Sequence, residues 1–89
     1  MPIQILSSPS SGKEIARDLE RAIAAAFPDA RVEVHDNGGG HFEIRVVSAT
    51  FAQQSRVVQQ QRVYAAIAHL MKGDAAPVHA VDRLITETA

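Results

Sequence analysis

A run of turn-forming residues, Asp36–Gly40, separates two stretches in which charged and apolar residues alternate. Glycine accepts positive φ at no steric cost and asparagine tolerates it, so this run is typical of a reversal of the chain. Residues 31–35 before it and residues 42–47 after it have the period-2 pattern of half-buried strands. The sequence therefore predicts an antiparallel hairpin. The apolar face of its second strand consists of Phe42, Ile44 and Val46.

The three consecutive glycines of this turn, Gly38, Gly39 and Gly40, also raise the question of an anion site. Consecutive backbone N–H groups can bind a phosphate. A nucleotide-binding loop of this kind would continue into a helix through a Lys-Ser or Lys-Thr pair. Here the next element has the pattern of a strand, and no such pair follows. We therefore expect a plain flexible hairpin turn.

A helix is predicted before the hairpin. Ser11 and Glu14 have the S-x-x-E spacing of a capping box, in which two side chains satisfy backbone N–H groups of the first turn. An apolar stripe at helical spacing follows them. It consists of Ile15, Leu19, Ala22, Ile23, Ala26 and Phe27. Pro28 disfavours helical geometry at the residue before it, so we expect the helix to end at Phe27.

A second helical region is predicted from about residue 56 to residue 72, with Ser55 as its N-cap and Gly73 as its C-terminal cap. Its main apolar stripe consists of Val63, Ile67, Leu70 and Met71, with Val57 and Tyr64 beside it. The polar run 58–61 is expected to be exposed, in a short helix that bends into the longer one. His69 falls near the core stripe, and we expect it to be structural.

A last strand is expected after Pro77. Residues 78–81 are mostly apolar, and residues 84–85 continue the pattern. Asp82 and Arg83 break its alternation.

The order of elements is therefore α-β-β-α(α)-β. A hairpin plus one returning strand makes a three-stranded mixed sheet with helices packed on one face, which is an α+β architecture. We expect one small domain over residues 11–89, preceded by an N-terminal extension over residues 1–10.

The chain has no cysteine. This excludes disulfides, a thiol nucleophile and an iron–sulfur cluster held by the chain's own thiolates. The formal net charge is −1, yet residues 44–73 carry four basic side chains and no acidic one. That segment is either a solvated helix face or a docking surface for an acidic partner or a phosphate backbone. We find no nucleophile–base pairing and no paired carboxylates in an apolar setting, so we do not expect an enzyme.

The N-terminus lacks the charged start and apolar core of a signal peptide. No stretch approaches the roughly 18 apolar residues of a membrane span. We therefore expect a cytoplasmic protein without a membrane partner.

Several short motifs occur together in a specific order and spacing. They are His41-Phe42, Val47-Ser48 followed by Phe51, Ser55-Arg56-Val57 with Gln60 and Val63-Tyr64, and finally His79-Ala80. In this arrangement the chain resembles the BolA-like family, over roughly residues 14–86. The resemblance implies a variant of the type II KH fold.

The resemblance also implies a function without catalysis. BolA-like proteins pair with monothiol glutaredoxins and share a [2Fe–2S] cluster with them, for iron–sulfur trafficking or iron sensing. The glutaredoxin brings its cysteine and a bound glutathione, and the BolA-like protein brings its C-terminal histidine, which by position is His79. Imidazole in place of thiolate on one iron is an established arrangement. The isolated protein is then expected to hold no cluster and to be a monomer or a weak homodimer.

Some members of the family add a second ligand from the loop between the first two strands. This loop is short here and lacks the extended insert that carries that ligand. His35, at one base of the hairpin, is the substitute candidate. His41, at the other base, aligns with the family's His before Phe, which is not the position usually assigned to that ligand, and is a weaker candidate. Both are equally compatible with ordinary hairpin residues.

The alternative function is a KH-like DNA-binding transcriptional regulator of stress response and cell morphology, as some bacterial members are described. It would use Arg56, Arg62 and the glycine turn Gly38–Gly40. Net charge −1 and a pI of about 6.4 count against it. Residues 53–62 also contain no glycine, so the Gly-x-x-Gly loop of KH domains is missing. Val58, Gln59 and Gln60 stand where relatives often have basic residues, which weakens the phosphate contacts that DNA affinity needs.

Overall fold

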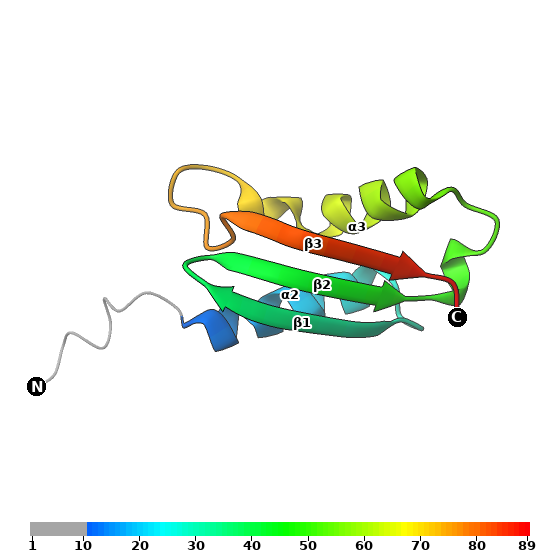
Figure 1. The fold of residues 1–89 in the computed structure, drawn as a ribbon, viewed down its shortest axis with the longest axis horizontal. Helices are drawn as coiled ribbons and strands as arrows, with labels where there is room; N and C mark the ends of the chain where they lie inside the picture. The colour runs from blue at the N-terminus through cyan, green and yellow to red at the C-terminus, as the bar shows by residue number, and fades with distance from the viewer. Residues whose placement is uncertain (1–10) are drawn as a thin grey trace, which may run out of the picture.

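The computed structural model describes residues 11–89 of the chain. In chain order its elements are α2 (Gly12–Ala26), β1 (Arg31–Gly38), β2 (His41–Val47), the 3₁₀ helix η1 (Ala49–Phe51), α3 (Arg56–Met71) and β3 (Ala80–Glu87) (Figure 1). The predicted order of helices and strands is confirmed, and the predicted N-terminal extension lies outside the described residues. No helix within residues 11–89 is long and apolar enough to cross a membrane.

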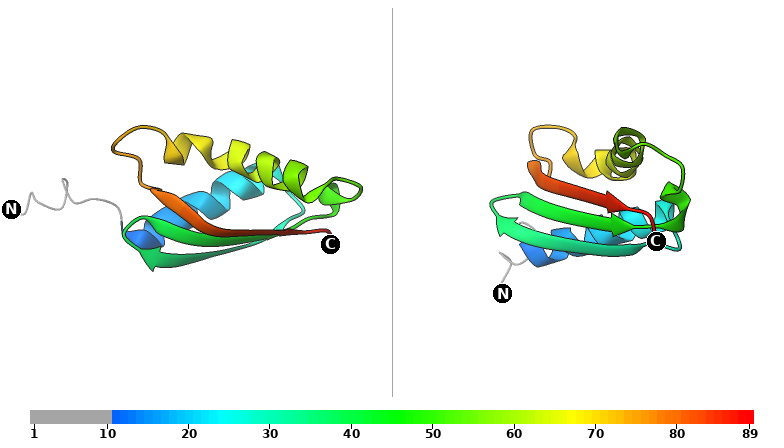
Figure 2. Two further views of the ribbon diagram at one scale, coloured as in Figure 1. Left: turned by 45° about the horizontal axis from the view of Figure 1, so that its top comes forward. Right: turned by 45° about the vertical axis from the view of Figure 1, so that its right-hand side comes forward.

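The three strands form one mixed sheet with β2 in the middle. β2 is antiparallel to β1 and parallel to β3. Parallel pairing needs a crossover connection, which η1 and α3 supply. Both long helices lie on one face of the sheet, and no described element covers the other face, called here the open face (Figure 2). The predicted α+β class and sheet are confirmed.

A bulge interrupts β3 near its start. Val81 is paired with Phe42, and the next pair is Arg83 with Glu43, so Asp82 is an extra residue in β3. A bulge shifts the alternation by one position, which explains why the sequence pattern of this strand looks broken. The strand runs two residues later than the predicted span at both ends.

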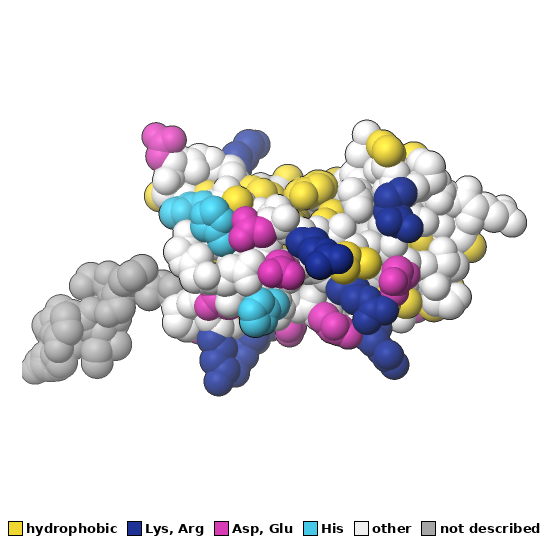
Figure 3. Space-filling view, in the orientation of Figure 1, with side chains coloured by type: hydrophobic (Ala, Val, Ile, Leu, Met, Phe, Trp, Pro, Cys, Tyr) yellow, Lys and Arg dark blue, Asp and Glu magenta, His cyan; other side chains and the backbone are white. Residues whose placement is uncertain are grey.

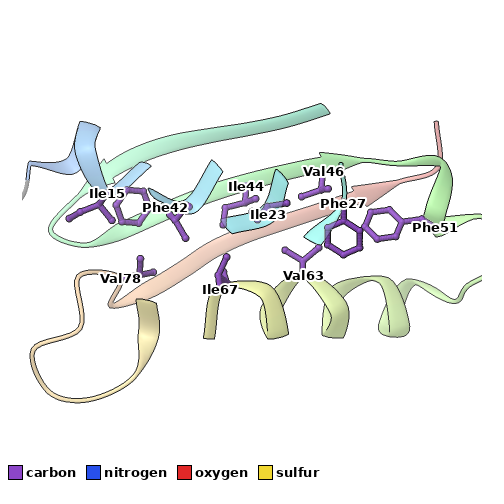
Figure 4. Packing of buried hydrophobic residues seen from close by; sticks show 11 residues of the cluster. Ile15, Ile23, Phe27, Phe42, Ile44, Val46, Phe51, Val63, Ile67 and Val78 are labelled. Carbon is purple, nitrogen blue, oxygen red and sulfur yellow. The ribbon is translucent and has the colours of Figure 1, made fainter. Parts of the chain in front are cut away.

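The core lies between the sheet and the two helices (Figure 4). Its buried members are Ile15, Leu19, Ile23, Phe27, Phe42, Ile44, Val46, Phe51, Val63, Ile67 and Val78. The rings of Phe27 and Phe51 meet edge to face, with centroids 5.1 Å apart. Such a pair contributes about 0.5–1.5 kcal/mol beyond its buried area. The predicted inward face of β2 is confirmed, and that of the first helix is confirmed except at Ala26, which is exposed.

Helix α2 begins and ends as predicted. Ser11 Oγ accepts a hydrogen bond from the N–H of Glu14 at 3.1 Å, and Glu14 Oε1 accepts one from the N–H of Ser11 at 2.9 Å. The backbone hydrogen bond from Ser11, helped by the serine hydroxyl, lowers the pKa of Glu14. At the other end Phe27 is the cap residue, directly before Pro28.

Helix α3 is one continuous helix, and Ser55 Oγ accepts a hydrogen bond from the N–H of Val58 at its start. The short helix expected to bend into it is instead η1, which lies upstream and is separate. Two apolar residues expected beside the core stripe, Val57 and Tyr64, are exposed. His69 is exposed too, so the expectation of a core position for it is wrong.

The prediction that the polar run at the start of α3 is exposed is wrong at Gln59, which is only 7% exposed. Its amide Nε2 donates to the carbonyl oxygens of Phe51 and Gln54, and its Oε1 accepts from the hydroxyl of Thr86. A buried amide is tolerated when its donors and acceptor are satisfied in this way. Gln59 therefore joins η1, the following loop and the end of β3.

Candidate functional site

The hairpin turn and the first residues of β3 meet at one end of the sheet. The carbonyl oxygen of Gly40 accepts hydrogen bonds from the N–H of His79 at 2.8 Å and from the N–H of Ala80 at 3.2 Å. On the other side of His79, Val78 is buried, and its N–H donates to the carbonyl of Leu70 at 3.1 Å. The backbone around His79 is therefore held at both sides, while His79 itself is exposed.

Gly40 makes room for the imidazole of His79. Its φ is +83°, in the region that residues with a side chain rarely adopt. A Cβ at this position would lie 2.9 Å from both Cγ and Nδ1 of His79, closer than van der Waals contact. The ring thus packs against the backbone of the turn. No hydrogen bond within residues 11–89 engages its nitrogens.

His41, the next residue along, is paired with a carboxylate. Its Nδ1 lies 2.9 Å from Oδ1 of Asp82, the extra residue of the β3 bulge. Asp82 Oδ2 accepts a second hydrogen bond, at 3.1 Å, from the side-chain amide of Asn37. The same amide also donates to Glu43. This network ties the hairpin to β3 beside the anchor of His79.

The hydrogen bond from His41 lowers the pKa of the Asp82 carboxyl, and the bond from Asn37 lowers it further. Asp82 is therefore ionised at neutral pH. An ionised carboxylate only accepts hydrogen bonds.

His35 lies elsewhere on the open face. Its Cα is paired with that of Glu43 in the hairpin, and it lines a shallow hollow of about 380 Å³ together with charged residues of all three strands. Among these, Arg45 donates to Glu87 at 2.6 Å and lies 3.7 Å from Glu33. The bond to Glu87 raises the pKa of Arg45. Within the hollow, Arg45 is thus paired with Glu33, and it reaches Glu87 beside the hollow.

Histidine side chains are visible at the hairpin end of the open face, next to acidic side chains (Figure 3). Basic and acidic side chains are interspersed over the rest of that face (Figure 3). No group of three or more His, Cys, Asp or Glu side chains within residues 11–89 could hold a metal ion by itself. The described part of the chain can therefore supply imidazole nitrogens to a metal, but not a complete set of ligands.

The residues proposed for DNA contact do not come together. Arg56 is exposed in the first turn of α3, whereas the glycine turn lies near the opposite end of that helix (Figure 1). The guanidinium of Arg62 lies 5.0 Å from the centroid of the Phe27 ring and donates to the side chain of Gln54 at 3.0 Å. Arg62 is therefore engaged in packing within the domain.

Sequence reasoning missed Asp82 and Asn37 as members of the site. The one available signal was the broken alternation at Asp82, which marks the bulge. Its partner His41 lies 41 positions earlier in the chain, so no local pattern connects the two.

Comparison with known proteins identifies a family for this chain. A family model described as BolA-like protein matches residues 22–88. Among curated protein sequences, none matches this chain.

Solved structures of similar proteins span nearly the whole chain. The structure of a bolA protein homologue from Coxiella burnetii has 31% sequence identity and a TM-score of 0.64, covering 81% of this chain and 87% of its own. A bol-like protein from Babesia bovis has 25% identity and a TM-score of 0.66, covering 89% and 87%. BolA1 from Arabidopsis thaliana has 16% identity and a TM-score of 0.68, covering 90% and 94%, and it supports the fold alone.

Proposed function

Because the chain belongs to the BolA-like protein family, we propose that it is a non-enzymatic partner of a monothiol glutaredoxin and that the two share a [2Fe–2S] cluster through His79. BolA-like proteins bring a C-terminal histidine to such a cluster, and the resemblance implies that His79 is that histidine here. The proposed task is iron–sulfur trafficking or iron sensing.

The observation that carries the proposal is the combination of a fixed backbone and an exposed ring at His79. The carbonyl of Gly40 holds the backbone, and the missing Cβ of Gly40 leaves space for the imidazole. A ligand that must reach a metal held by another protein has to be exposed. Pre-organisation lowers the entropy that is lost when it binds. His79 meets both requirements.

The other ligands of the cluster would come from the partner. This chain has no cysteine, so the thiolates would be those of the glutaredoxin and its bound glutathione. When bound, the cluster supplies electron-transfer chemistry, and a histidine ligand raises its reduction potential relative to thiolate ligation. The part of this chain is to present a nitrogen ligand at a defined place and to bind its partner.

The alternative DNA-binding role has less support from the geometry. Its two arginines and its glycine turn do not form one surface, and Arg62 is occupied by Phe27 and Gln54. A protein–DNA contact that depends on phosphate neutralisation needs several free cations on one face. We therefore retain the cluster role as the proposed function.

The test is an anaerobic titration of the protein into a cluster-loaded monothiol glutaredoxin, followed by visible absorption and circular dichroism. We expect the spectrum to change up to a defined stoichiometry and His79→Ala to lose the change. His69→Ala is the matched control, because His69 is also exposed but lies on α3, and it should behave as the wild type. An unchanged wild-type spectrum, with no complex on a sizing column, would overturn the proposal.

A further inference from the structure

Asn37 is the only asparagine of the chain, and a glycine follows it. Because Gly38 has no Cβ, its backbone nitrogen is open to approach by the side chain of the residue before it. Asn37 is exposed, and it is the extra residue of a bulge in β1, between the pairs Asp36–Phe42 and Gly38–His41. Its backbone therefore lies outside the regular strand pairing, at the start of the turn.

An asparagine followed by glycine can convert to aspartate or isoaspartate without a catalyst. The backbone nitrogen of Gly38 loses its hydrogen and bonds to Cγ of Asn37, and the bond between Cγ and Nδ2 breaks. The amide group leaves as ammonia, taking up that hydrogen through the solvent, and a cyclic imide remains. Water then opens the imide at Cγ, which gives aspartate, or at the main-chain carbonyl, which gives isoaspartate. Water is the only co-reactant.

The folded structure holds both of the groups that would react. The N–H of Gly38 donates to Oδ1 of Asp36 at 2.8 Å, and a carboxylate beside this nitrogen disfavours the loss of its hydrogen. Asn37 Nδ2 donates to Glu43 Oε2 and to Asp82 Oδ2, each at 3.1 Å. An amide nitrogen carries two hydrogens, so both are engaged. Ring closure has to move a side chain that is tied at two points.

We propose that Asn37 is a site of spontaneous deamidation and that its hydrogen bonds to Glu43 and Asp82 slow the reaction. The bond to Asp82 joins the hairpin to β3, so it is lost whenever β3 separates from the hairpin. Parts of a domain open in this way while the rest stays folded. Because the reaction is irreversible, converted molecules accumulate in proportion to the time that this end of the sheet spends open.

The products would weaken the same end of the sheet. An aspartate at position 37 has no amide hydrogens to donate, and it places a third carboxylate beside Glu43 and Asp82. Like charges this close destabilise one another. Isoaspartate also inserts a methylene into the backbone of the turn that contains Gly40, whose carbonyl anchors His79. Conversion of Asn37 would therefore loosen the support of the backbone at His79.

The first test measures the conversion during incubation at mildly alkaline pH. Cleavage with trypsin places Asn37 in the peptide of residues 32–45, and mass spectrometry detects the exchange of –NH₂ for –OH in that peptide. We expect both products in the wild type, and faster conversion of the chain unfolded in guanidinium chloride. The same measurement on the unincubated protein gives the starting level.

Two glycine variants show whether the reaction passes through the backbone nitrogen of Gly38. Gly38→Ala should lose most of the products, because the new Cβ hinders the approach to this nitrogen. Gly39→Ala is the matched control and should convert like the wild type. Both glycines have positive φ, and a Cβ at either would meet no atom of residues 11–89 within 4 Å. Equal conversion in the two variants would overturn the proposed reaction.

The second test concerns the two carboxylates. We expect Asp82→Ala and Glu43→Ala each to speed the conversion about fivefold, the factor that one hydrogen bond of ordinary strength contributes to an equilibrium. Glu87→Ala is the matched control, because Glu87 is also a carboxylate of β3 but pairs with Arg45. It should convert at the wild-type rate. Backbone amide spectra show whether each variant is folded, and Glu43→Ala covers the case in which Asp82→Ala unfolds.

The remaining outcomes decide the inference without reference to the proposed function. If neither the wild type nor Asp82→Ala converts under conditions in which the unfolded chain does, Asn37 is not a modification site of the folded protein. If Asp82→Ala and Glu43→Ala convert no faster than Glu87→Ala, the role of the two carboxylates is overturned. None of these measurements involves a cluster or a glutaredoxin, so the failure of one proposal leaves the other in place.

Discussion

Replacing Gly40 with alanine should disturb His79 in a way that replacing Gly39 with alanine does not. Both glycines have positive φ, +83° and +65°. A Cβ at position 39 would meet no atom of residues 11–89 within 4 Å, whereas one at position 40 would lie 2.9 Å from Cγ and Nδ1 of His79. The two variants therefore share a backbone cost and differ only in one side-chain contact.

The shared cost follows from the backbone. A residue with a side chain costs about 1–2 kcal/mol in the left-handed region. The smaller freedom of alanine in the unfolded chain offsets about 0.4–1 kcal/mol of this. Each variant should thus lose roughly 1 kcal/mol of unfolding free energy. In Gly40→Ala, the contact involves the base of the imidazole, so rotation about χ1 of His79 is needed to relieve it.

Urea denaturation followed by circular dichroism measures the shared loss, and imidazole ¹H–¹³C spectra report the position of the His79 ring. We expect similar unfolding free energies for the two variants and a displaced His79 ring signal only in Gly40→Ala. Equal His79 signals in the two variants would show that the ring does not pack on Gly40. This reasoning would then be refuted, whatever the cluster chemistry.

Three further results are expected. Gln59→Leu should lower the unfolding free energy by about 2–3 kcal/mol, measured by urea denaturation, because it leaves the buried hydroxyl of Thr86 without its acceptor and removes the amide's hydrogen bonds to the carbonyls of Phe51 and Gln54. A loss below about 0.5 kcal/mol, the usual range of a surface change, would contradict this. Arg62→Ala should cost about 0.5–1 kcal/mol through the lost cation–π contact, while Arg56→Ala, which removes an exposed side chain, should not be measurably destabilising. Hydrogen bonds from the N–H of Ala49 and the hydroxyl of Ser48 lower the pKa of Asp29 in the folded protein. The stability that Asp29 contributes should therefore be complete above the pKa of an unfolded aspartate, about 3.9, and should disappear as the pH falls through the lower pKa of the folded state. If the unfolding free energy of Asp29→Asn has the same pH dependence as that of the wild type, this prediction is wrong.

The parts of the fold that the sequence predicts are those decided by neighbours in the chain. The capping box of Ser11 and Glu14 spans three positions, and the hairpin follows from alternation around a glycine turn. Pro28 ends α2 through its effect on the preceding residue. Each of these is a local rule that needs no knowledge of what packs against the element.

The features that the sequence does not predict depend on distant partners. Gln59 looks like a surface residue until Thr86, 27 positions away, supplies a hydroxyl for it. The pairing of His41 with Asp82 depends on the register of two strands separated by a whole helix. His79 was identified through the family resemblance and not through its own surroundings, because a histidine before a strand has no distinctive pattern.

The pairing of β3 with the rest of the sheet has a consequence for how a bound metal would affect the protein's motions. Within the described residues 11–89, β3 is an edge strand that pairs only with β2. Parts of a domain can open locally while the rest stays folded. Opening β3 would separate His79 from Gly40 and Asp82 from His41 at once. A metal bound through His79 would bind the protein only while β3 is paired with β2. By mass action, this binding would raise the free energy that is needed to open β3. Amide hydrogen exchange would then slow in β3, with little change in α2.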